Sequence, residues 1–208
     1  MLINPMIILI IGLLFILFFG GLSYIRREGL SLQFAIEGLV ITLIFSVLSW
    51  GIKWETNPVF FLALLYVITF RVRILVDFAN YFDRRNQTNL SKKIYQLANK
   101  LIPDLINQLI IKINQAVSNI RQGRYDEGIQ IINEILQNRT TGFMGIKTEA
   151  ACYYNLAIAY KRKGLNKAAQ EYFQKVIDTL PASIYSAKAM VEIRKEKEKL
   201  QPQVKDQE

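Results

Sequence analysis

Charged residues are almost absent from the first 70 positions of this 208-residue chain, and this constrains the fold more than any motif. No charge occurs in residues 1–25, only Glu37 is charged in residues 29–52, and residues 56–70 again carry none. A helix of about 20 apolar residues crosses the roughly 30 Å hydrocarbon layer of a bilayer. The pattern therefore predicts a transmembrane region of residues 1–71 with spans at about 6–24, 32–52 and 58–74.

The third segment is short, because its uncharged part ends at Phe70. It reaches a spanning length only if it continues past Arg71 and Arg73, whose charged ends would extend toward water. For the first segment, a cleaved signal peptide is the alternative interpretation. No positive residue precedes that segment and no small-x-small cleavage site follows it, so a membrane span is favoured.

The charge distribution predicts an orientation. Residues 1–70 carry three cations and three anions, whereas residues 71–208 carry 23 cations and 14 anions, so the net charge of +9 lies entirely after the third segment. Arg26 and Arg27 lie between the first two segments, and loops rich in Arg and Lys stay cytoplasmic. We expect an N-terminus outside and a cytoplasmic remainder, in a bacterial plasma membrane. The single cysteine, Cys152, agrees with a reducing compartment.

Bulky, small and turn residues recur at fixed spacing in residues 150–183. The positions are Tyr153, Leu156, Ala157, Tyr160, Gly164, Ala169, Phe173, Val176 and Pro181. This spacing resembles the tetratricopeptide repeat, a helix–turn–helix unit that stacks on its neighbours to form a solenoid. The resemblance implies small residues where two helices cross closely, a left-handed turn at Gly164, and a helix end at Pro181.

Two earlier copies align with this one. The copy at 109–142 places Gly123 where Gly164 stands and keeps Asn114, Ala116, Gly128, Ile132 and Ile135, but Gln115, Asn119 and Thr140 depart from the pattern. The copy at 72–105 carries Leu75, Phe78, Ala79, Phe82, Asn86, Ser91, Tyr95, Ala98 and Pro103. Asn86 can replace the turn glycine, because asparagine accepts positive φ more readily than most residues. The expected fold is all-α, with three transmembrane helices followed by a short solenoid at 72–200.

No helix-breaking residue lies between Pro58 and Arg85, so the third span and the first repeat helix are expected to form one continuous rod. The alternative is a short span followed by a separate amphipathic helix, with Arg71, Arg73, Phe78, Tyr81 and Phe82 on the lipid headgroups. After the third repeat, residues 184–200 predict a capping helix with one apolar face. Residues 201–208 predict a disordered tail.

Residues for catalysis are scarce. The chain has no histidine, which removes the usual general base and most zinc sites, and it has no phosphate-binding loop or serine elbow motif. We therefore expect a protein that is not an enzyme and holds no cofactor or metal. Cys152, among alanines and tyrosines, is interpreted as a packing residue.

Glu37 is the one ionisable residue inside a predicted span. Such residues often relay protons or ions. It lies close to the first loop, however, so a pair with Arg26 or Arg27 is the favoured interpretation.

The family resemblance implies a concave groove lined by the first helix of each repeat. Its candidate protein-binding residues are Asn80, Asp83, Asn114, Tyr154, Lys161 and Arg162. Some relatives grip a C-terminal carboxylate there with two asparagines and flanking cations. Val76, Ala151 and Asn155 stand where those cations are expected, which argues against that clamp.

A second candidate surface is basic. Arg71, Arg73, Arg84, Arg85, Lys92 and Lys93 fall close to the predicted membrane surface. Their charge suits anionic lipid headgroups, and membrane attachment makes lipid a nearer partner than nucleic acid.

These observations predict an integral membrane protein whose cytoplasmic repeats bind a protein or peptide partner and scaffold or assist assembly of a membrane complex. A small transporter or channel accessory subunit, with the repeats serving oligomerisation or regulation, is the alternative. Self-association of the repeats is a third hypothesis.

Overall fold

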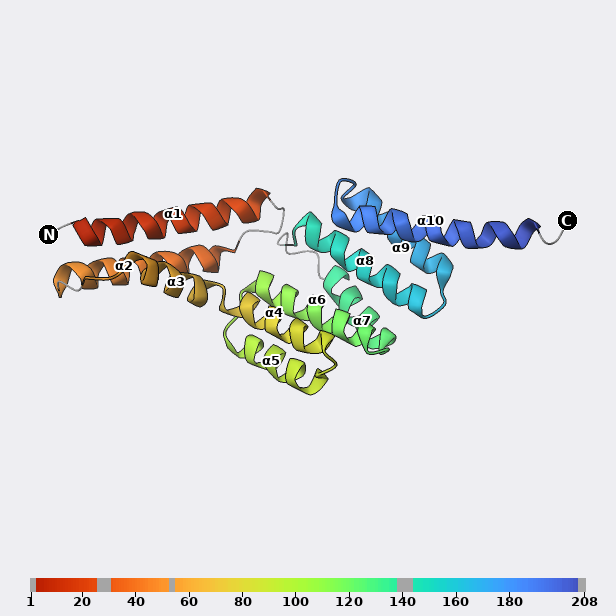
Figure 1. The fold of residues 1–208 in the computed structure, drawn as a ribbon, viewed down its shortest axis with the longest axis horizontal. Coiled ribbons are helices and arrows are strands. Elements are labelled where there is room, and N and C mark those ends of the chain that lie inside the picture. The colour runs from red at the N-terminus through yellow and green to blue at the C-terminus, as the bar shows by residue number, and fades with distance from the viewer. Residues whose placement is uncertain (1–2, 26–30, 53–54, 138–143, 206–208) are drawn as a thin grey trace. The chain divides into compact units, whose positions relative to one another are not determined.

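The computed structural model describes residues 3–25, 31–52, 55–137 and 144–205, and in this part of the chain it confirms an all-α fold (Figure 1). The described residues form ten helices and no strand: α1 (Ile3–Ile25), α2 (Leu32–Gly51), α3 (Pro58–Thr69), α4 (Arg71–Arg84), α5 (Thr88–Lys100), α6 (Leu105–Arg121), α7 (Tyr125–Gln137), α8 (Ile146–Arg162), α9 (Asn166–Thr179) and α10 (Ile184–Lys205). The chain divides into two compact units, residues 1–114 and residues 115–208, and the division falls inside α6.

The helices α1 and α2 are long and apolar enough to cross a membrane. Their outward side chains are apolar and highly exposed: Leu17 is 70% exposed, Phe18 is 64% exposed and Val47 is 60% exposed. Exposure of this extent along whole helices is unusual for a water-facing surface. A third span exists only if α3 and α4 are counted as one bent span.

α1, α2 and α3 lie together at the N-terminal end of the chain (Figure 1). They pack around Ile8, Phe15, Phe61 and Leu65, with Phe15 in α1 and Phe61 in α3. The contact between α1 and α2 is close at Gly12. A Cβ atom at that position would lie 2.1 Å from the Oγ1 atom of Thr42. Thr42 is fully buried and donates its hydroxyl proton to the carbonyl of Gly38 at 2.7 Å. The small residue Gly12 in α1, and a threonine in α2 whose hydroxyl is hydrogen-bonded within its own helix, therefore allow these helices to approach closely. Such contacts are common between helices in lipid.

The expected rod from Pro58 to Arg85, and with it a straight span to residue 74, is wrong. α3 ends at Thr69, α4 begins at Arg71, and the two helices are bent by 69°. At 1.5 Å per residue, the twelve residues of α3 extend about 18 Å. This is well short of the hydrocarbon thickness.

Tertiary contacts produce the bend where no proline or glycine marks it. The ring of Phe70 lies among those of Phe19, Phe34 and Tyr66, with centroid distances of 5.0, 5.4 and 4.9 Å. The next residue, Arg71, donates to the carbonyl of Ile68 at 2.9 Å. An aromatic anchor and a cation that satisfies a carbonyl beside the break thus stabilise a geometry that helix propensity alone disfavours.

α4 and α5 form the helix pair expected for residues 72–105. Its core contains Val72, Val76 and Ala79 of α4, Tyr95 and Ala98 of α5, and Ile111 of α6. Asn86, between the two helices, has φ of 59°, in the left-handed conformation expected of it. The alignment of this segment with the later repeats was therefore sufficient to place its turn.

The second unit contains α7 to α10. Gly123 and Gly164 adopt φ of 82° and 79° at the turns after α6 and α8, as the repeat pattern predicts. α8 and α9 pack through Ala157, Ala169, Phe173 and Val176, with Ala189 of α10 completing the cluster. Cys152 is fully buried in α8, in agreement with a packing role.

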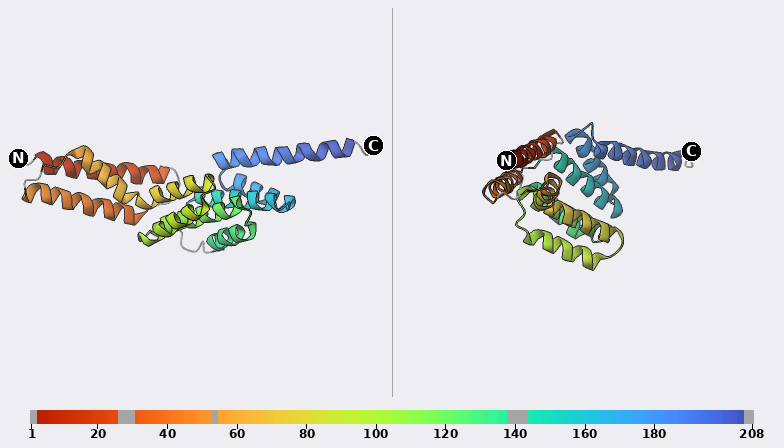
Figure 2. Two further views of the ribbon diagram at one scale, coloured as in Figure 1. Left: turned by 60° about the horizontal axis from the view of Figure 1, so that its bottom comes forward. Right: turned by 60° about the vertical axis from the view of Figure 1, so that its left-hand side comes forward.

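α10 packs on α9 and α8 with its N-terminal half and extends beyond them with its C-terminal half (Figure 2). The buried hydroxyl of Ser186 donates to the carbonyl of Val176 at 3.3 Å, which joins the start of α10 to the end of α9. The disordered tail expected from residue 201 is wrong as far as Lys205, where α10 ends. Residues 194–201 are all good helix formers, and this run carries the helix past the expected end of the cap.

Candidate functional sites

In the first unit, the two groove asparagines bind each other. The Nδ2 atom of Asn80 donates to Oδ1 of Asn114 at 2.9 Å, and the Tyr95 hydroxyl donates to Oδ1 of Asn80 at 2.7 Å. Asn114 in turn donates to the carbonyl of Ile110 at 2.7 Å. Asp83 is only 7% exposed. These three candidates therefore contribute to the packing of α4, α5 and α6.

In the second unit, α10 covers two of the three groove candidates. Lys161 forms an ion pair with Glu192 of α10 at 2.5 Å. The ring of Tyr154 lies against those of Phe173 and Tyr185, with centroid distances of 5.9 and 5.8 Å. Arg162 is exposed and donates to the carbonyl of Ile120 at 3.3 Å. Arg162 is thus the most accessible of the six groove candidates.

Electrostatics at this contact follow from its geometry. The hydrogen bond from Lys161 holds the pKa of Glu192 below its ordinary value, although partial burial acts in the opposite direction. Burial raises the pKa of Tyr154, and the nearby carboxylate of Glu192 adds to that effect. The pair joins the last repeat helix to the cap in its charged state.

A tyrosine stack lies between α8 and α9. The rings of Tyr160 and Tyr172 are 5.3 Å apart and almost parallel, and the ammonium of Lys175 lies 4.7 Å from the Tyr172 centroid. Burial raises the pKa of Tyr160. Cation–π and offset ring contacts of this kind stabilise packed surfaces. The sequence pattern marked Tyr160 as a packing position but gave no indication of the stack.

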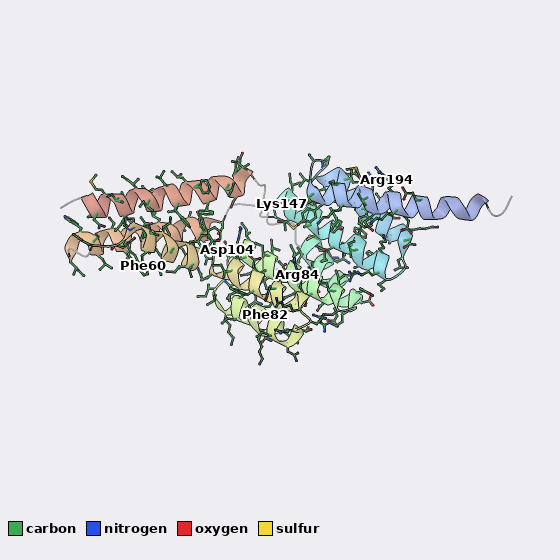
Figure 3. The ribbon with its side chains drawn as sticks, viewed as in Figure 1. Phe60, Phe82, Arg84, Asp104, Lys147 and Arg194 are labelled. Carbon is green, nitrogen blue, oxygen red and sulfur yellow. The ribbon has the colours of Figure 1, made fainter. Side chains whose placement is uncertain are left out.

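The predicted basic cluster is divided by the structure. Arg71 belongs to an internal ion pair, and the guanidinium of Arg73 lies 5.8 Å from the Phe70 centroid. Arg84, Arg85, Lys92 and Lys93 are exposed on α4, the turn after it, and α5 (Figure 3 labels Arg84). Arg85 covers the ring of Tyr81 at 4.5 Å. Four of the six cations therefore remain at the surface of the first helix pair.

Glu37 of α2 binds Arg71 at the start of α4. Two bonds join them, from Nη1 to Oε2 at 2.5 Å and from Nη2 to Oε1 at 2.8 Å. Gln33, one turn earlier, also donates to Glu37 at 2.7 Å. The expected partners, Arg26 and Arg27, lie outside the described residues. The hypothesis of a paired carboxylate is supported, but its partner here comes from the bend between α3 and α4.

The turn between α5 and α6 is bound to the same place, a relationship that sequence reasoning missed. Arg71 donates to the carbonyl of Leu101 at 3.2 Å, Gln33 donates to the carbonyl of Ile102 at 3.0 Å, and Ser31 donates to the carboxylate of Asp104. Figure 3 labels Asp104 at this junction. The side chains enclose a small polar hollow that includes Glu37.

Ile102 in this turn has φ of 51°. A left-handed conformation is rare for a β-branched residue, and Pro103 restricts the preceding residue further. Such backbone strain costs on the order of 1–3 kcal/mol. The sequence did hold part of the signal, because Ser31 and Asp104 are both favourable helix N-cap residues, and each accepts a backbone N–H bond from its own helix.

Comparison with known proteins supports the repeat assignment. No curated protein and no solved structure matches the chain. The family model described as tetratricopeptide repeat matches residues 107–182, which cover most of α6 and all of α7, α8 and α9. The helix pair α4–α5 lies outside the matched segment. The match supports tetratricopeptide repeats in residues 107–182.

Proposed function

We propose that this is an integral membrane tetratricopeptide protein, in which α1, α2 and the bent α3–α4 segment each cross the bilayer and the repeats bind a protein partner to scaffold or assemble a membrane complex. The observation that carries the proposal is the presence, in one chain, of a tetratricopeptide match at residues 107–182 and two long apolar helices before it. Stacked repeats of this family generally serve protein–protein interaction. The proposed role is therefore binding, not catalysis.

The membrane arrangement is tested by protease protection. The proposal places the N-terminus outside a bacterial plasma membrane and the repeats in the cytoplasm. An N-terminal tag should be digested in intact spheroplasts, and a C-terminal tag only in inverted vesicles. Digestion of both tags from the same side would contradict the orientation, and release of the protein by alkaline extraction would contradict the spans.

Partner binding is tested by crosslinking in native membranes. Arg162 is the accessible groove candidate, so Arg162→Glu should reduce capture of the partner severalfold. Lys167→Glu, on the exposed start of α9, makes the same charge change and is the matched control. Equal capture of the partner by both variants would contradict a role for this face. Undiminished capture by a variant that carries both changes would contradict it as well.

A transport role, the alternative hypothesis, has less support from the geometry. The charge of Glu37 is balanced by Arg71, whose Nη1 and Nη2 atoms both donate to its carboxylate, and the amide of Gln33 donates a further bond. The carboxylate is therefore engaged in holding helices together. We therefore propose a structural role for Glu37. A swap of the two charges separates this role from an ion relay.

A further inference from the structure

We propose that the turn between α5 and α6 inserts Ile102 and Leu105 into the lipid leaflet beside the start of α2. This inference rests on the proposed membrane location of α1 and α2 and adds a second point of lipid contact, within the repeat region itself. The two side chains would contact the boundary between headgroups and acyl chains of a phospholipid leaflet.

The turn between α5 and α6 exposes apolar side chains at a place where the backbone is conformationally constrained. Ile102 is 79% exposed and Leu105 is 53% exposed. A single exposed apolar residue needs no explanation. Here, however, a β-branched side chain is held outward at a positive φ, immediately before a proline. Backbone strain that the surroundings maintain is a recurrent mark of a functional position.

The turn between α5 and α6 is bound to the start of α2. Its backbone carbonyls at Leu101 and Ile102 accept bonds from Arg71 and Gln33, and its Asp104 accepts one from Ser31. Ser31 is the N-cap of α2 and Gln33 lies in its first turn. The twenty residues of α2 extend about 30 Å, which equals the hydrocarbon thickness, so its first turn coincides with one boundary of that layer. The turn is thereby fixed at the same depth.

The start of α2, beside this turn, also exposes apolar side chains. Leu32 and Ile36, on the first turns of α2, are 74% and 52% exposed and would meet lipid in any arrangement that uses α2 as a span. Ile102 and Leu105 lie next to this part of α2, because the Ile102 carbonyl accepts a bond from Gln33 and Asp104 accepts one from Ser31. Lys100, exposed at the end of α5 and two residues before Ile102, is a cation available to phosphate headgroups.

The test uses the full chain in vesicles of phosphatidylcholine and phosphatidylglycerol, with a small fluorophore on one introduced cysteine in a Cys152→Ala background. Labels are placed by Ile102→Cys and, separately, Leu105→Cys. Ile44→Cys, in the middle of α2 at 50% exposure, reports lipid contact of a span. Gln96→Cys, on the exposed polar side of α5, is the water-facing control. Quenching is measured with lipids brominated on the acyl chain and with aqueous iodide.

The expected result is severalfold stronger quenching by brominated lipid at 102 and 105 than at 96, with quenching at 44 as the reference. If 44 is quenched but 102 and 105 behave like 96, the inference is overturned while the membrane proposal stands. If 44 is not quenched, the membrane proposal fails and the inference fails with it. Protection of 102 from both quenchers would indicate a protein surface, such as a second copy of the chain, and would also overturn lipid insertion.

Discussion

Arg71 and Glu37, 34 positions apart, form a two-bond ion pair at the point where the α3–α4 segment bends by 69°. Each side chain is about one quarter exposed, so solvent only partly screens the pair. The same guanidinium also reaches the carbonyls of Ile68 and Leu101. One arginine thus connects α2, the bend and the turn after α5.

Removing the charge of Glu37 should destabilise the first unit. In Glu37→Gln, Arg71 loses its carboxylate partner while keeping its position, which should cost about 1–3 kcal/mol. The measurement is thermal unfolding in detergent micelles. Glu55→Gln, which alters an exposed carboxylate of the same unit, is the control and should leave the midpoint unchanged.

Exchanging the two charges distinguishes a structural pair from an ion relay. The double variant Glu37→Arg with Arg71→Glu should recover much of the stability that either single change loses, because the pair can form in reverse. If Glu37 relayed protons or ions, activity of the membrane complex would stay lost in the double variant despite recovered stability. Recovery of both together is the result expected from the structure.

The contact between α1 and α2 predicts a glycine requirement at one position and not at another. Gly12→Ala would place a Cβ 2.1 Å from Thr42 Oγ1 and 2.7 Å from Thr42 Cβ, so no rotamer of Thr42 relieves the clash. We expect destabilisation of about 1–3 kcal/mol. Gly20→Ala, in the same helix with open space around it, should be neutral or slightly stabilising. Equal midpoints for the two variants in detergent melts would refute close packing at Gly12.

The ion pair between Lys161 and Glu192 predicts an acid-sensitive contribution to stability. Because the folded pKa of Glu192 is depressed, this contribution is present above the unfolded value near 4.5 and is lost as pH falls through the folded pKa. Lys161→Met should therefore lower the melting temperature at neutral pH and have less effect in strong acid. Lys188→Met, on the exposed side of α10, should show no such dependence.

The left-handed turn at Asn86 predicts opposite results for two substitutions. Asn86→Gly should retain stability, since glycine accepts a φ of 59° without strain, whereas Asn86→Val should cost about 1–2 kcal/mol. Gln87→Val, at φ of −88°, controls for loss of a polar side chain. Denaturation followed by circular dichroism gives the comparison, and a tolerated Asn86→Val would contradict a repeat-like turn between α4 and α5.

Most of the fold could be predicted from local patterns in the sequence. The segments with at most one charge predicted α1 and α2, and small and bulky residues at repeat spacing predicted the pairs α4–α5, α6–α7 and α8–α9, together with the positive φ at Asn86, Gly123 and Gly164. These features depend on residues a few positions apart. The helices follow from the periodicity of apolar residues, and the turns between them were implied by the resemblance to the tetratricopeptide repeat.

Features that depend on distant residues were missed. The bend at Phe70 results from rings in α1, α2 and α3, and no breaker marks it. Glu37 was assigned to a nearby loop, while its partner lies beyond two further helix boundaries. The groove candidates Asn80, Asn114 and Lys161 were placed on the right helices, but their bonds to one another or to α10 could not be foreseen from repeat spacing.

The stacked tyrosines of α8 and α9 have a practical optical consequence. Both tryptophans of the chain, Trp50 and Trp54, belong to the first unit, whereas the Tyr160–Tyr172 stack belongs to the second. Tryptophan emission therefore reports on the first unit, whereas the coupled tyrosine rings add a contribution to the near-ultraviolet dichroism that comes from the second unit. A single unlabelled sample can reveal which of the two units melts first.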